Sequence, residues 1–506
     1  MYIAPNSTIY ILKNVRIDNT YANTIHFNSS NEQALYFQGL QKYVLTDYSY
    51  LRKENAIRVE LRTDNLYDCN YIMFQNSSFG PKWFYAFITN VEYVNNETSA
   101  IYYEIDVMQT WYFNYTVNPS FIEREHSASD DPGDNLVPDN LELGEYVSDD
   151  FDGTTHMSNY SIVCAATFDN DYNDAVGKDY GGVYSGLAYT IYTDSDNFSE
   201  WLEGAVSAGK ADGIVSIFLM PTDFAIGYET SSPKSYDITK TKNLTQIGGY
   251  TPKNKKLFTY PYNFLYVTNL SGSSAEFHYE LFSGDSCEFG MVGDTSCNPQ
   301  VILYPKNYKG VTANYNEKIV MDGFPQCAYG TDAFKAWLAQ TGASSAVSMT
   351  AGIAGLGLAS GPLGVMASLG SIGSVVAQAY QHEVMPPQAR GSQANSTMLA
   401  AKIKDFAFMH VHVQEQFARI IDDYWDMYGY PSHRVKLPNI STRPHWNYVK
   451  TINVSITGNV PSDDMAKIKS IYDNGVTFWR YGNEVGNYAL DNRIASNTLN
   501  GGDTNG

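Results

Sequence analysis

The fold class is decided by the segment Trp83-Phe-Tyr-Ala-Phe-Ile-Thr-Asn-Val-Glu-Tyr93 and by its continuation, Ala100-Ile-Tyr-Tyr-Glu-Ile-Asp-Val-Met108. Aromatic and β-branched residues dominate both runs, and such residues favour strands. The intervening Asn95-Asn-Glu-Thr-Ser99 consists of residues that are typical of turns. The sequence therefore predicts a long β-hairpin over residues 83–108.

Shorter runs with strand character surround this hairpin. They are apolar or alternate apolar and polar side chains, and polar residues or proline bound several of them. These runs are residues 9–12, 15–17, 57–61, 162–168, 214–220 and 406–413. We therefore expect a mainly β protein.

Three segments have helical spacing instead. One is the short segment 198–208. The segment 414–428 ends at Gly429, which closes helices readily, and the segment 462–474 begins with a Ser462 cap and ends at Gly475. The segment 462–474 is expected to bury Met465, Ile468 and Ile471, and the apolar residues at helical spacing in 414–428 are Phe417, Ile420, Ile421, Tyr424, Trp425 and Tyr428. The predicted fold class is thus mainly β with some α (α+β).

An uncharged insert interrupts this pattern, because no Asp, Glu, Lys or Arg lies between Lys335 and His382. Residues 341–379 consist largely of Gly, Ala and Ser, with larger apolar residues spaced through them. Ala359-Ser-Gly-Pro-Leu-Gly364 predicts a central turn, and each arm is long enough for a helix of about 27 Å. The larger apolar positions that we assign to plugging or membrane insertion are Met349, Ile353, Leu356, Leu358, Leu363, Val365, Leu369, Ile372 and Val376.

Three interpretations of the insert remain open. It is a helical hairpin that enters a membrane conditionally, a helical hairpin buried in the protein's own core, or a flexible linker rich in small residues. A permanent membrane anchor is not expected, since the arms are short and rich in glycine and have no positive flank.

The composition limits the possible functions. At 506 residues the chain has room for several domains, and we expect boundaries at 1–145, 146–330, 331–400 (the insert), 401–492 and 493–506, the last a disordered tail. The net charge of −21 argues against ordinary nucleic-acid binding, which needs cations, although an acidic wall would let DNA slide past. The five cysteines have no metal-binding spacing and indicate free thiols. The first residues show no secretory pattern, so synthesis in the cytoplasm is expected.

No motif of catalysis, cofactor binding or metal binding is present, and we expect no enzyme activity, cofactor or metal. For several polar groups we expect structural roles rather than functional sites. His410 and His412 share one face of a strand without a third ligand, and the carboxylates Glu104 and Asp106 are expected on one exposed strand face. Residues 123–126 (Glu-Arg-Glu-His) are expected to form an ion-paired patch. Calcium binding by Asp130, Asp131, Asp134 and Asp139 has weak support, because they lack the order of a calcium loop.

Several ordered blocks resemble the tail knob proteins of small short-tailed phages of Gram-positive bacteria, the phi-29-type podoviruses. Together they cover about half of the chain and flank the insert. The blocks are Tyr71-Ile-Met-Phe-Gln-Asn76, Lys82-Trp-Phe-Tyr-Ala-Phe87, Tyr103-Glu-Ile-Asp-Val-Met-Gln-Thr-Trp111, Ser120-Phe-Ile-Glu-Arg-Glu-His126, Tyr428-Gly-Tyr430, Arg434-Val-Lys-Leu-Pro-Asn439, Trp446-Asn-Tyr-Val-Lys-Thr451, Tyr472-Asp-Asn-Gly-Val-Thr-Phe-Trp479 and Gly486-Asn-Tyr488.

The resemblance implies a structural virion protein with β-barrel or β-sandwich domains. Six copies would form a ring-shaped tube, the insert would plug its lumen, and the insert would later penetrate the host cell membrane. Implied partners are other tail and connector proteins, the host membrane, and double-stranded DNA that passes through without sequence-specific binding. A glycan-binding or glycan-degrading tail protein and an independent pore-forming toxin are the alternatives.

Overall fold

The computed structural model describes residues 6–48, 55–76, 80–149, 151–175, 179–180, 183–324, 326–328 and 405–494. The chain divides into two compact units. Unit 1 comprises Met1–Glu145, Thr245–Tyr262 and Val413–Gly506, and unit 2 comprises Tyr146–Leu244 and Asn263–His412. Each unit is therefore assembled from segments that lie far apart in the sequence.

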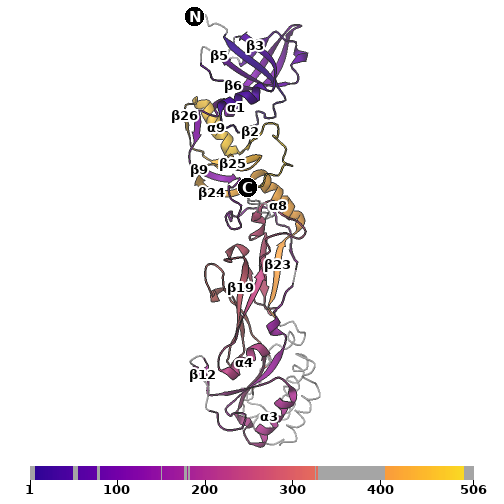
Figure 1. The fold of residues 1–506 in the computed structure, drawn as a ribbon, viewed down its shortest axis with the longest axis vertical. Coiled ribbons are helices and arrows are strands. Elements are labelled where there is room, and N and C mark those ends of the chain that lie inside the picture. Colours follow the sequence, from indigo (N-terminus) through magenta and orange to yellow (C-terminus); the bar gives the residue numbers. More distant parts are fainter. Residues whose placement is uncertain are drawn as a thin grey trace, which may run out of the picture. The chain divides into compact units, whose positions relative to one another are not determined.

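Within its described residues, unit 1 begins with a six-stranded sheet in the order β3-β1-β5-β6-β7-β4, which curls into a half-barrel (Figure 1). Its strands are β1 (Ser7–Lys13), β3 (Gln41–Tyr48), β4 (Ala56–Val59), β5 (Cys69–Asn76), β6 (Phe84–Asn95) and β7 (Thr98–Ile105). The antiparallel pairing of β6 with β7 confirms the predicted hairpin. Residues 15–17 were expected to be a strand, and this is wrong. Asn14 has a left-handed backbone (φ 58°) just after β1, and Val15 and Ile17 fill the core without strand pairing.

At the centre of the half-barrel both faces are buried, and successive side chains of a strand there point into two different cores. In β5, Ile72 and Phe74 face a core inside the half-barrel, whereas Tyr71 and Met73 face a second core on its outer side. The second core also contains the short helices α1 (Ser30–Gln38) and α2 (Val107–Trp111). The side chains on the outer face of the half-barrel therefore pack in one core with the C-terminal part of the chain.

That C-terminal part supplies most of a second sheet, of order β2-β27-β25-β9-β24. The strands are β2 (Asn23–Ile25), β9 (Ser120–Glu125), β24 (Tyr430–Lys436), β25 (Trp446–Ile452) and β27 (Val476–Trp479), beside the two-stranded pair β8 (Tyr115–Val117) and β26 (Ile456–Gly458). β2 pairs with β27 in parallel, over a sequence separation of more than 400 residues.

Two helices complete the described part of unit 1, α8 (Glu415–Tyr428) and α9 (Ser462–Asn474), and both confirm predicted helices. α8 ends at Gly429 (φ 65°), where a Cβ atom would lie 2.1 Å from the backbone oxygen of Glu125. Ile420, one of the apolar residues at helical spacing, is exposed on α8. The Ser462 cap is wrong by one residue, because Pro461 holds the cap position and Ser462 is the first helical residue.

Asp106 is the clearest departure from expectation in this unit. It was expected on an exposed strand face with Glu104, but it is buried and caps α2 by accepting hydrogen bonds from the Gln109 backbone N–H (3.1 Å) and the Tyr71 hydroxyl (2.8 Å). Glu104 does lie near the surface, paired with Lys467. Burial raises the pKa of Asp106 to about 6.

The described part of unit 2 contains three four-stranded sheets and a small hairpin, β12 (Asp179–Tyr180) with β13 (Val183–Tyr184). The sheet β14-β11-β15-β22 consists of β11 (Tyr160–Ala166), β14 (Ala188–Tyr192), β15 (Ile214–Pro221) and β22 (Gln326–Ala328). The sheet β10-β23-β17-β18 consists of β10 (Tyr146–Ser148), β17 (Asn263–Thr268), β18 (Ser274–Phe277) and β23 (Ala407–Val413). The sheet β16-β19-β20-β21 consists of β16 (Ser235–Thr241), β19 (Ser286–Gly293), β20 (Val301–Pro305) and β21 (Ile319–Met321).

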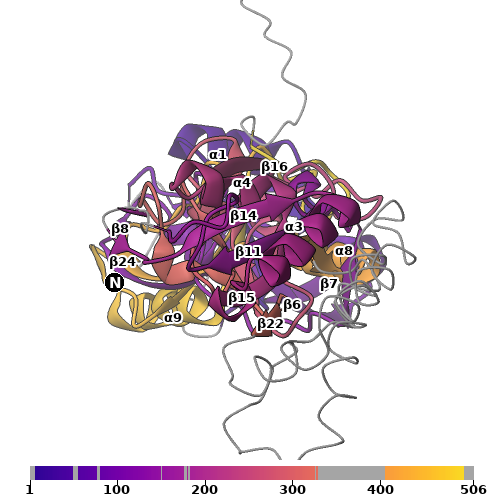
Figure 2. The same ribbon diagram turned by 90° about the horizontal axis from the view of Figure 1, so that it is seen from below.

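The helices of unit 2 cover its first sheet. α3 (Ser195–Ser207) and α4 (Thr222–Thr230) lie beside β11, β14 and β15 (Figure 2). Every residue of β11 is buried, which explains its continuous apolar sequence. The predicted strands at 162–168, 214–220 and 406–413 and the helix at 198–208 are confirmed, and the fold is mainly β with some helices.

Other side chains agree with their expected structural roles. The described cysteines Cys69, Cys164, Cys287 and Cys297 are free thiols. The His410 imidazole lies against the Tyr279 hydroxyl, and the His412 imidazole lies 3.0 Å from the Asp149 carboxylate. Among the described helices, none is both long enough and apolar enough to cross a membrane.

Candidate functional site

The nine apolar positions assigned to the insert all lie outside the described residues. The points where the chain leaves the described structure and returns to it are both well defined. On the leaving side, Phe324 is buried and β22 pairs with β15. On the returning side, Asp405 precedes the buried strand β23. These two stems fix the ends of the insert to unit 2.

One residue of each stem lies close to the same tyrosine, Tyr160. The rings of Tyr160 and Phe324 have centroids 6.4 Å apart. Burial raises the pKa of Tyr160, and the negative charge of nearby Asp405 raises it further. Asp405 is held by Thr154, which donates its backbone N–H at 2.9 Å and its hydroxyl at 2.6 Å. Phe324 and Asp405 thus both lie close to Tyr160, whereas β22 continues from Phe324 along β15 as far as Ala328, which pairs with Ser216. No sequence signal identified Thr154 or Tyr160.

A second group of functional candidates lies in unit 1, around residues 123–126. Its three charged residues each have an ion partner, as predicted, but none pairs within the group. Glu123 pairs with Lys450 (2.7 Å), Arg124 binds both carboxylate oxygens of Asp139 (2.7 and 2.8 Å), and Glu125 pairs with Lys436. Arg124 also donates to the backbone oxygen of Gly429, so the pairs tie β9 to the end of α8.

His126 completes this group as a buried neutral imidazole. Its Nδ1 accepts a hydrogen bond from the Tyr448 backbone N–H (2.7 Å), and its Nε2 lies 3.0 Å from the backbone oxygen of Asp426. These partners require the proton on Nε2, because only a protonated nitrogen can donate to a carbonyl. Burial and the nearby Arg443 lower the pKa of His126 to about 3.

Replacing His126 with Asn should therefore change the pH dependence of stability. The unfolded chain takes up a proton near pH 6.5 that the folded chain excludes until about pH 3. Stability from this group is complete above pH 6.5 and is lost as the pH falls, by up to about 1.4 kcal/mol per pH unit. The free energy of unfolding, measured in urea, should fall between pH 6 and 4.5 in both proteins. In His126→Asn its fall per pH unit should be smaller than in the wild type by about this amount. Parallel curves would contradict the assignment.

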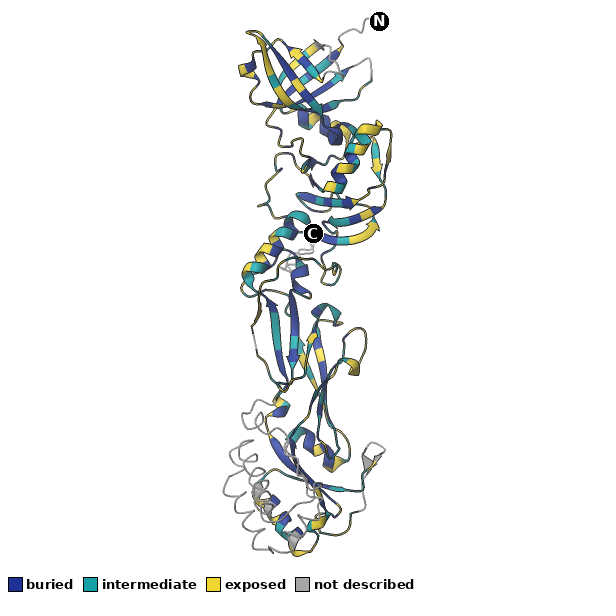
Figure 3. Cartoon of the chain, turned by 180° about the vertical axis from the view of Figure 1, so that it is seen from behind, coloured by how far each residue is buried: buried dark blue, intermediate teal, exposed yellow. Residues whose placement is uncertain are grey.

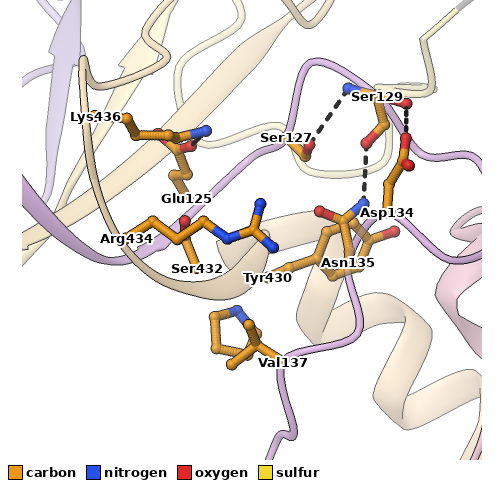
Figure 4. Close-up of a pocket in the computed structure, with 11 residues that line it drawn as sticks. Glu125, Ser127, Ser129, Asp134, Asn135, Val137, Tyr430, Ser432, Arg434 and Lys436 are labelled. Atoms are coloured by element: carbon orange, nitrogen blue, oxygen red, sulfur yellow. Dashed lines mark hydrogen bonds and ion pairs between the residues drawn. The ribbon is translucent and has the colours of Figure 1, made fainter.

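A hollow of about 250 Å³ lies beside these ion pairs. In Figure 4 the guanidinium of Arg434 extends over it, opposite Asn135 and Ser129. The two carboxylates of the lining are occupied. Glu125 pairs with Lys436 and accepts from the backbone N–H of Asn439 (2.9 Å), and Asp134 accepts from the Ser129 hydroxyl. The lining residues are Glu125, Ser127, Ser129, Asp134, Asn135, Val137, Tyr430, Pro431, Ser432, Arg434 and Lys436.

The four aspartates that were considered for calcium do not converge on a cation site. Asp130 accepts from the Lys255 backbone N–H (2.9 Å) and from the Tyr430 hydroxyl, and Asp139 holds Arg124. Across the part of the chain that the structure describes, no group of three or more His, Cys, Asp or Glu side chains is arranged to bind a metal.

A buried carboxylate on α8 fixes the segment Thr245–Tyr262 to unit 1. Asp422 accepts hydrogen bonds from the Tyr250 hydroxyl (2.6 Å) and from the backbone N–H groups of Lys253 (2.6 Å) and Asn254 (3.0 Å). The Asn254 side chain donates a further bond at 2.8 Å. Burial raises the pKa of Asp422 although these bonds oppose the shift. Sequence reasoning missed this network, because its members are about 170 residues apart.

The chain was compared with known protein families and with individual proteins. Residues 227–493 match the family model for the C-terminal domain of tail knob protein gp9 of Bacillus phage phi29, and residues 5–116 match the model for the N-terminus of caudoviral major tail proteins. The tail knob proteins gp9 of Bacillus phages B103 and PZA are 25% and 26% identical, over 96% of this chain and 98% of theirs.

A solved structure has the same fold. The tail knob protein gp12 of bacteriophage C1 superposes with a TM-score of 0.63 at 15% identity, covering 94% of this chain and 97% of that chain. The residues matched by the two family models include the half-barrel, both stems of the insert and the strands β2, β24, β25 and β27 of the second sheet. The chain therefore belongs to the phi29-type tail knob family, whose members are structural proteins of the phage tail and hence parts of the virion.

Proposed function

We propose that six copies of this chain form a tube at the end of the tail, through which the genome leaves the virion. The insert, residues 341–379, would plug the lumen and then act on the host cell membrane. The half-barrel is the observation that supports the proposed tube. Its residues are those that match the major tail protein model, and its sheet has two outer edges, β3 and β4.

The charge of the chain supports a conduit for DNA. With 54 acidic and 33 basic residues, each copy adds a net charge of −21 to the ring. Affinity for DNA comes from cations that neutralise phosphates, so a lumen lined by carboxylates would release the duplex rather than hold it. Double-stranded DNA is thus a passing partner, without sequence-specific contacts.

The stems support the proposal that the insert can leave the lumen and return to it while unit 2 stays folded. The described chain on each side of the insert is held in unit 2, through Phe324 and β22 before the insert and through Asp405 and β23 after it. A segment attached in this way can change its surroundings while unit 2 keeps its core. The uncharged sequence between the stems is what a bilayer accepts, since charges at its centre are costly.

Other tail and connector proteins and the host membrane are the remaining proposed partners. The described carboxylates beside the hollow of Figure 4 are occupied by donors of the protein itself, so the hollow gives no support to the glycan-degrading alternative. Measurable release of sugars from host cell wall, abolished by a carboxylate substitution, would instead favour that alternative.

Electron-microscopic class averages of the purified full-length chain test the tube. We expect rings with a central hole, and a deletion of residues 341–379 should leave the ring while opening the hole. A compact monomer at all concentrations would contradict the proposal. Leakage of dye from liposomes should require the insert, so equal leakage with and without it would contradict the membrane role.

A further inference from the structure

A cavity of about 450 Å³ lies where the half-barrel meets α1 and α2. It is lined by the first turns of α1, by the start of β6 with the chain before it, and by the end of α2 with the chain after it. Figure 3 shows both buried and exposed residues in this part of unit 1. Among the described lining residues Lys82 is the one charged side chain, and we call the space the Lys82 cavity. Its volume lies in the range of roughly 300–1,000 Å³ that small-molecule sites occupy.

Gln33 of α1 lines the cavity although it is only 3% exposed. Its Nε2 donates to the backbone oxygen and to the side-chain oxygen of Gln109, both at 2.8 Å. Gln109 in turn donates its own side-chain N–H groups to the Thr24 hydroxyl and to the Ile25 backbone oxygen, both at 2.9 Å. This network fixes the orientation of both amides. The Gln33 Oε1 atom is therefore the acceptor left for the cavity, and no described group donates to it.

The hydroxyl of Tyr85 is a second buried polar group at the cavity. Tyr85 is 2% exposed, lines the cavity, and packs its ring against Phe37 at 4.9 Å between centroids. No described group forms a hydrogen bond with its hydroxyl. Burial raises the pKa of Tyr85, so the hydroxyl keeps its proton and can both donate and accept. Because buried polar groups normally have a partner, two of them at one cavity indicate that it holds polar groups of a ligand.

The Lys82 ammonium has no carboxylate partner among the described residues. Its Nζ donates to the side-chain oxygen of Asn114 at 2.7 Å and lies 3.3 Å from the centroid of the Trp111 ring. One of its three N–H groups is then left for the cavity. Burial lowers the pKa of Lys82 to about 8, although the charge of Asp464 on α9 opposes the shift. An anion in the cavity would stabilise the charged form through a charge-assisted hydrogen bond.

Two aromatic rings supply apolar surface to the same cavity. Phe113 is 43% exposed, and Trp83 is half-buried with its ring edge-on to Tyr10 at 5.4 Å between centroids. Asn31 and Asn114 add exposed amide groups to the lining. A ligand with an apolar face and polar edges matches such a lining. A sugar ring has this form, since its C–H bonds lie on its faces and its hydroxyls project from its edge.

We propose that the Lys82 cavity binds a sugar unit that carries a carboxylate or a phosphate group. The anion pairs with Lys82, hydroxyls bond to Gln33 and Tyr85, and the sugar ring lies against Trp83 and Phe113. The site binds sugars without cleaving them, because glycoside hydrolysis uses a pair of carboxyl groups and no Asp or Glu belongs to the described lining. This function is additional to the proposed tube and does not depend on it.

A nucleotide is the nearest alternative ligand, since a base also stacks on aromatic rings and a phosphate also pairs with lysine. Nucleic-acid binding, however, depends on several cations along the backbone. The described lining of the cavity supplies one, in a chain of net charge −21. The hydroxyls of a sugar can bond to both the Gln33 oxygen and the Tyr85 hydroxyl, because a hydroxyl donates and accepts. We therefore favour a sugar, and a nucleotide enters the test as a competitor.

Isothermal titration calorimetry of the full-length chain at pH 7 tests this assignment. Glucuronate supplies the carboxylate and glucose 6-phosphate the phosphate, whereas glucose, inorganic phosphate and thymidine 5′-monophosphate are the comparison ligands. At least one of the two anionic sugars should bind at least about tenfold more tightly than every comparison ligand, and the tighter of the two identifies the anion. Absence of binding by both anionic sugars at millimolar concentrations would overturn the proposal. Equal or tighter binding of glucose, of inorganic phosphate or of thymidine 5′-monophosphate would also overturn it.

Single variants place the binding in this cavity. Lys82→Met removes the charge and keeps an unbranched side chain, so the affinity for the anionic sugar should fall at least about tenfold, to near that for glucose. Phe113→Ala, at an exposed ring, should weaken the same binding several-fold. Lys13→Met removes an exposed lysine of the half-barrel outside the cavity and should bind like the wild type. Circular dichroism and thermal melting show whether each variant is folded. Wild-type affinity in Lys82→Met would overturn the proposal, and if that variant does not fold, wild-type affinity in Phe113→Ala would do so.

The pH dependence of binding separates the charge of Lys82 from a structural role. Asp464 on α9 is the charged group that acts on Lys82, and Tyr85 is the other titratable residue of the described lining. Because the free chain loses the Lys82 proton near pH 8, the affinity for the anionic sugar should fall above this pH by up to about tenfold per pH unit. This slope should be absent in Lys82→Met. A wild-type affinity that stays constant between pH 7 and 10 would overturn the proposal.

Discussion

Phage carrying Ile353→Asp or Leu369→Asp should assemble normally and form at least about a hundredfold fewer plaques. Both positions lie in the uncharged insert between the stems at Phe324 and Asp405. A charged side chain near the centre of a bilayer costs roughly 2.5–3.5 kcal/mol, which is about a 70- to 400-fold loss in partitioning for each copy. Several copies acting together would increase the loss.

The measurement is the number of plaques per virion, with virions counted by electron microscopy. Leu369→Ile is the matched control and should infect like the wild type, because it keeps the apolar character of the position. Unchanged plaque formation by Ile353→Asp would contradict penetration by the insert. Absence of assembled virions would show that the insert acts in assembly instead.

Trp425→Ala should destabilise unit 1 by about 3–5 kcal/mol. Trp425 is fully buried on α8, and its ring packs edge-on against Tyr262 at 4.9 Å and Tyr430 at 5.5 Å. Its indole N–H donates to Asp139 (3.0 Å), the same carboxylate that holds Arg124. Truncation therefore opens a large cavity and also removes a donor from a buried ion pair.

Urea unfolding followed by fluorescence and circular dichroism measures this loss. Trp425→Phe keeps most of the packing and should lose less than half as much. The same helix offers a control in Ile420→Ala, where the 65% exposed side chain should change stability by less than about 0.5 kcal/mol. A loss below about 1 kcal/mol for Trp425→Ala would contradict the central position of this side chain.

Part of the element order could be predicted from the sequence, whereas most strands of the middle of the chain, such as β16 to β21, were not predicted. The β6–β7 hairpin, the buried strands β11 and β15 and the ends of α8 follow from local periodicity and from glycine, which act over a few residues. The resemblance to tail knob proteins could be recognised for the same reason, since each matching block is a continuous run of residues. The roles of individual buried side chains were harder to predict from the sequence. Asp106 lies in an alternating strand pattern, yet the fold uses it to cap α2.

A mainly β chain, an acidic composition and an uncharged insert could thus be predicted without the fold. Which distant groups meet became known only from the fold: Asp422 meets the 250–254 segment, His126 meets Tyr448 and Asp426, and Phe324 and Asp405 both lie close to Tyr160. The difference arises from the separation in sequence between the residues that interact. Strand and helix signals are set by neighbouring residues, whereas hydrogen bonds and ion pairs depend on chain segments that come together only when the core is buried.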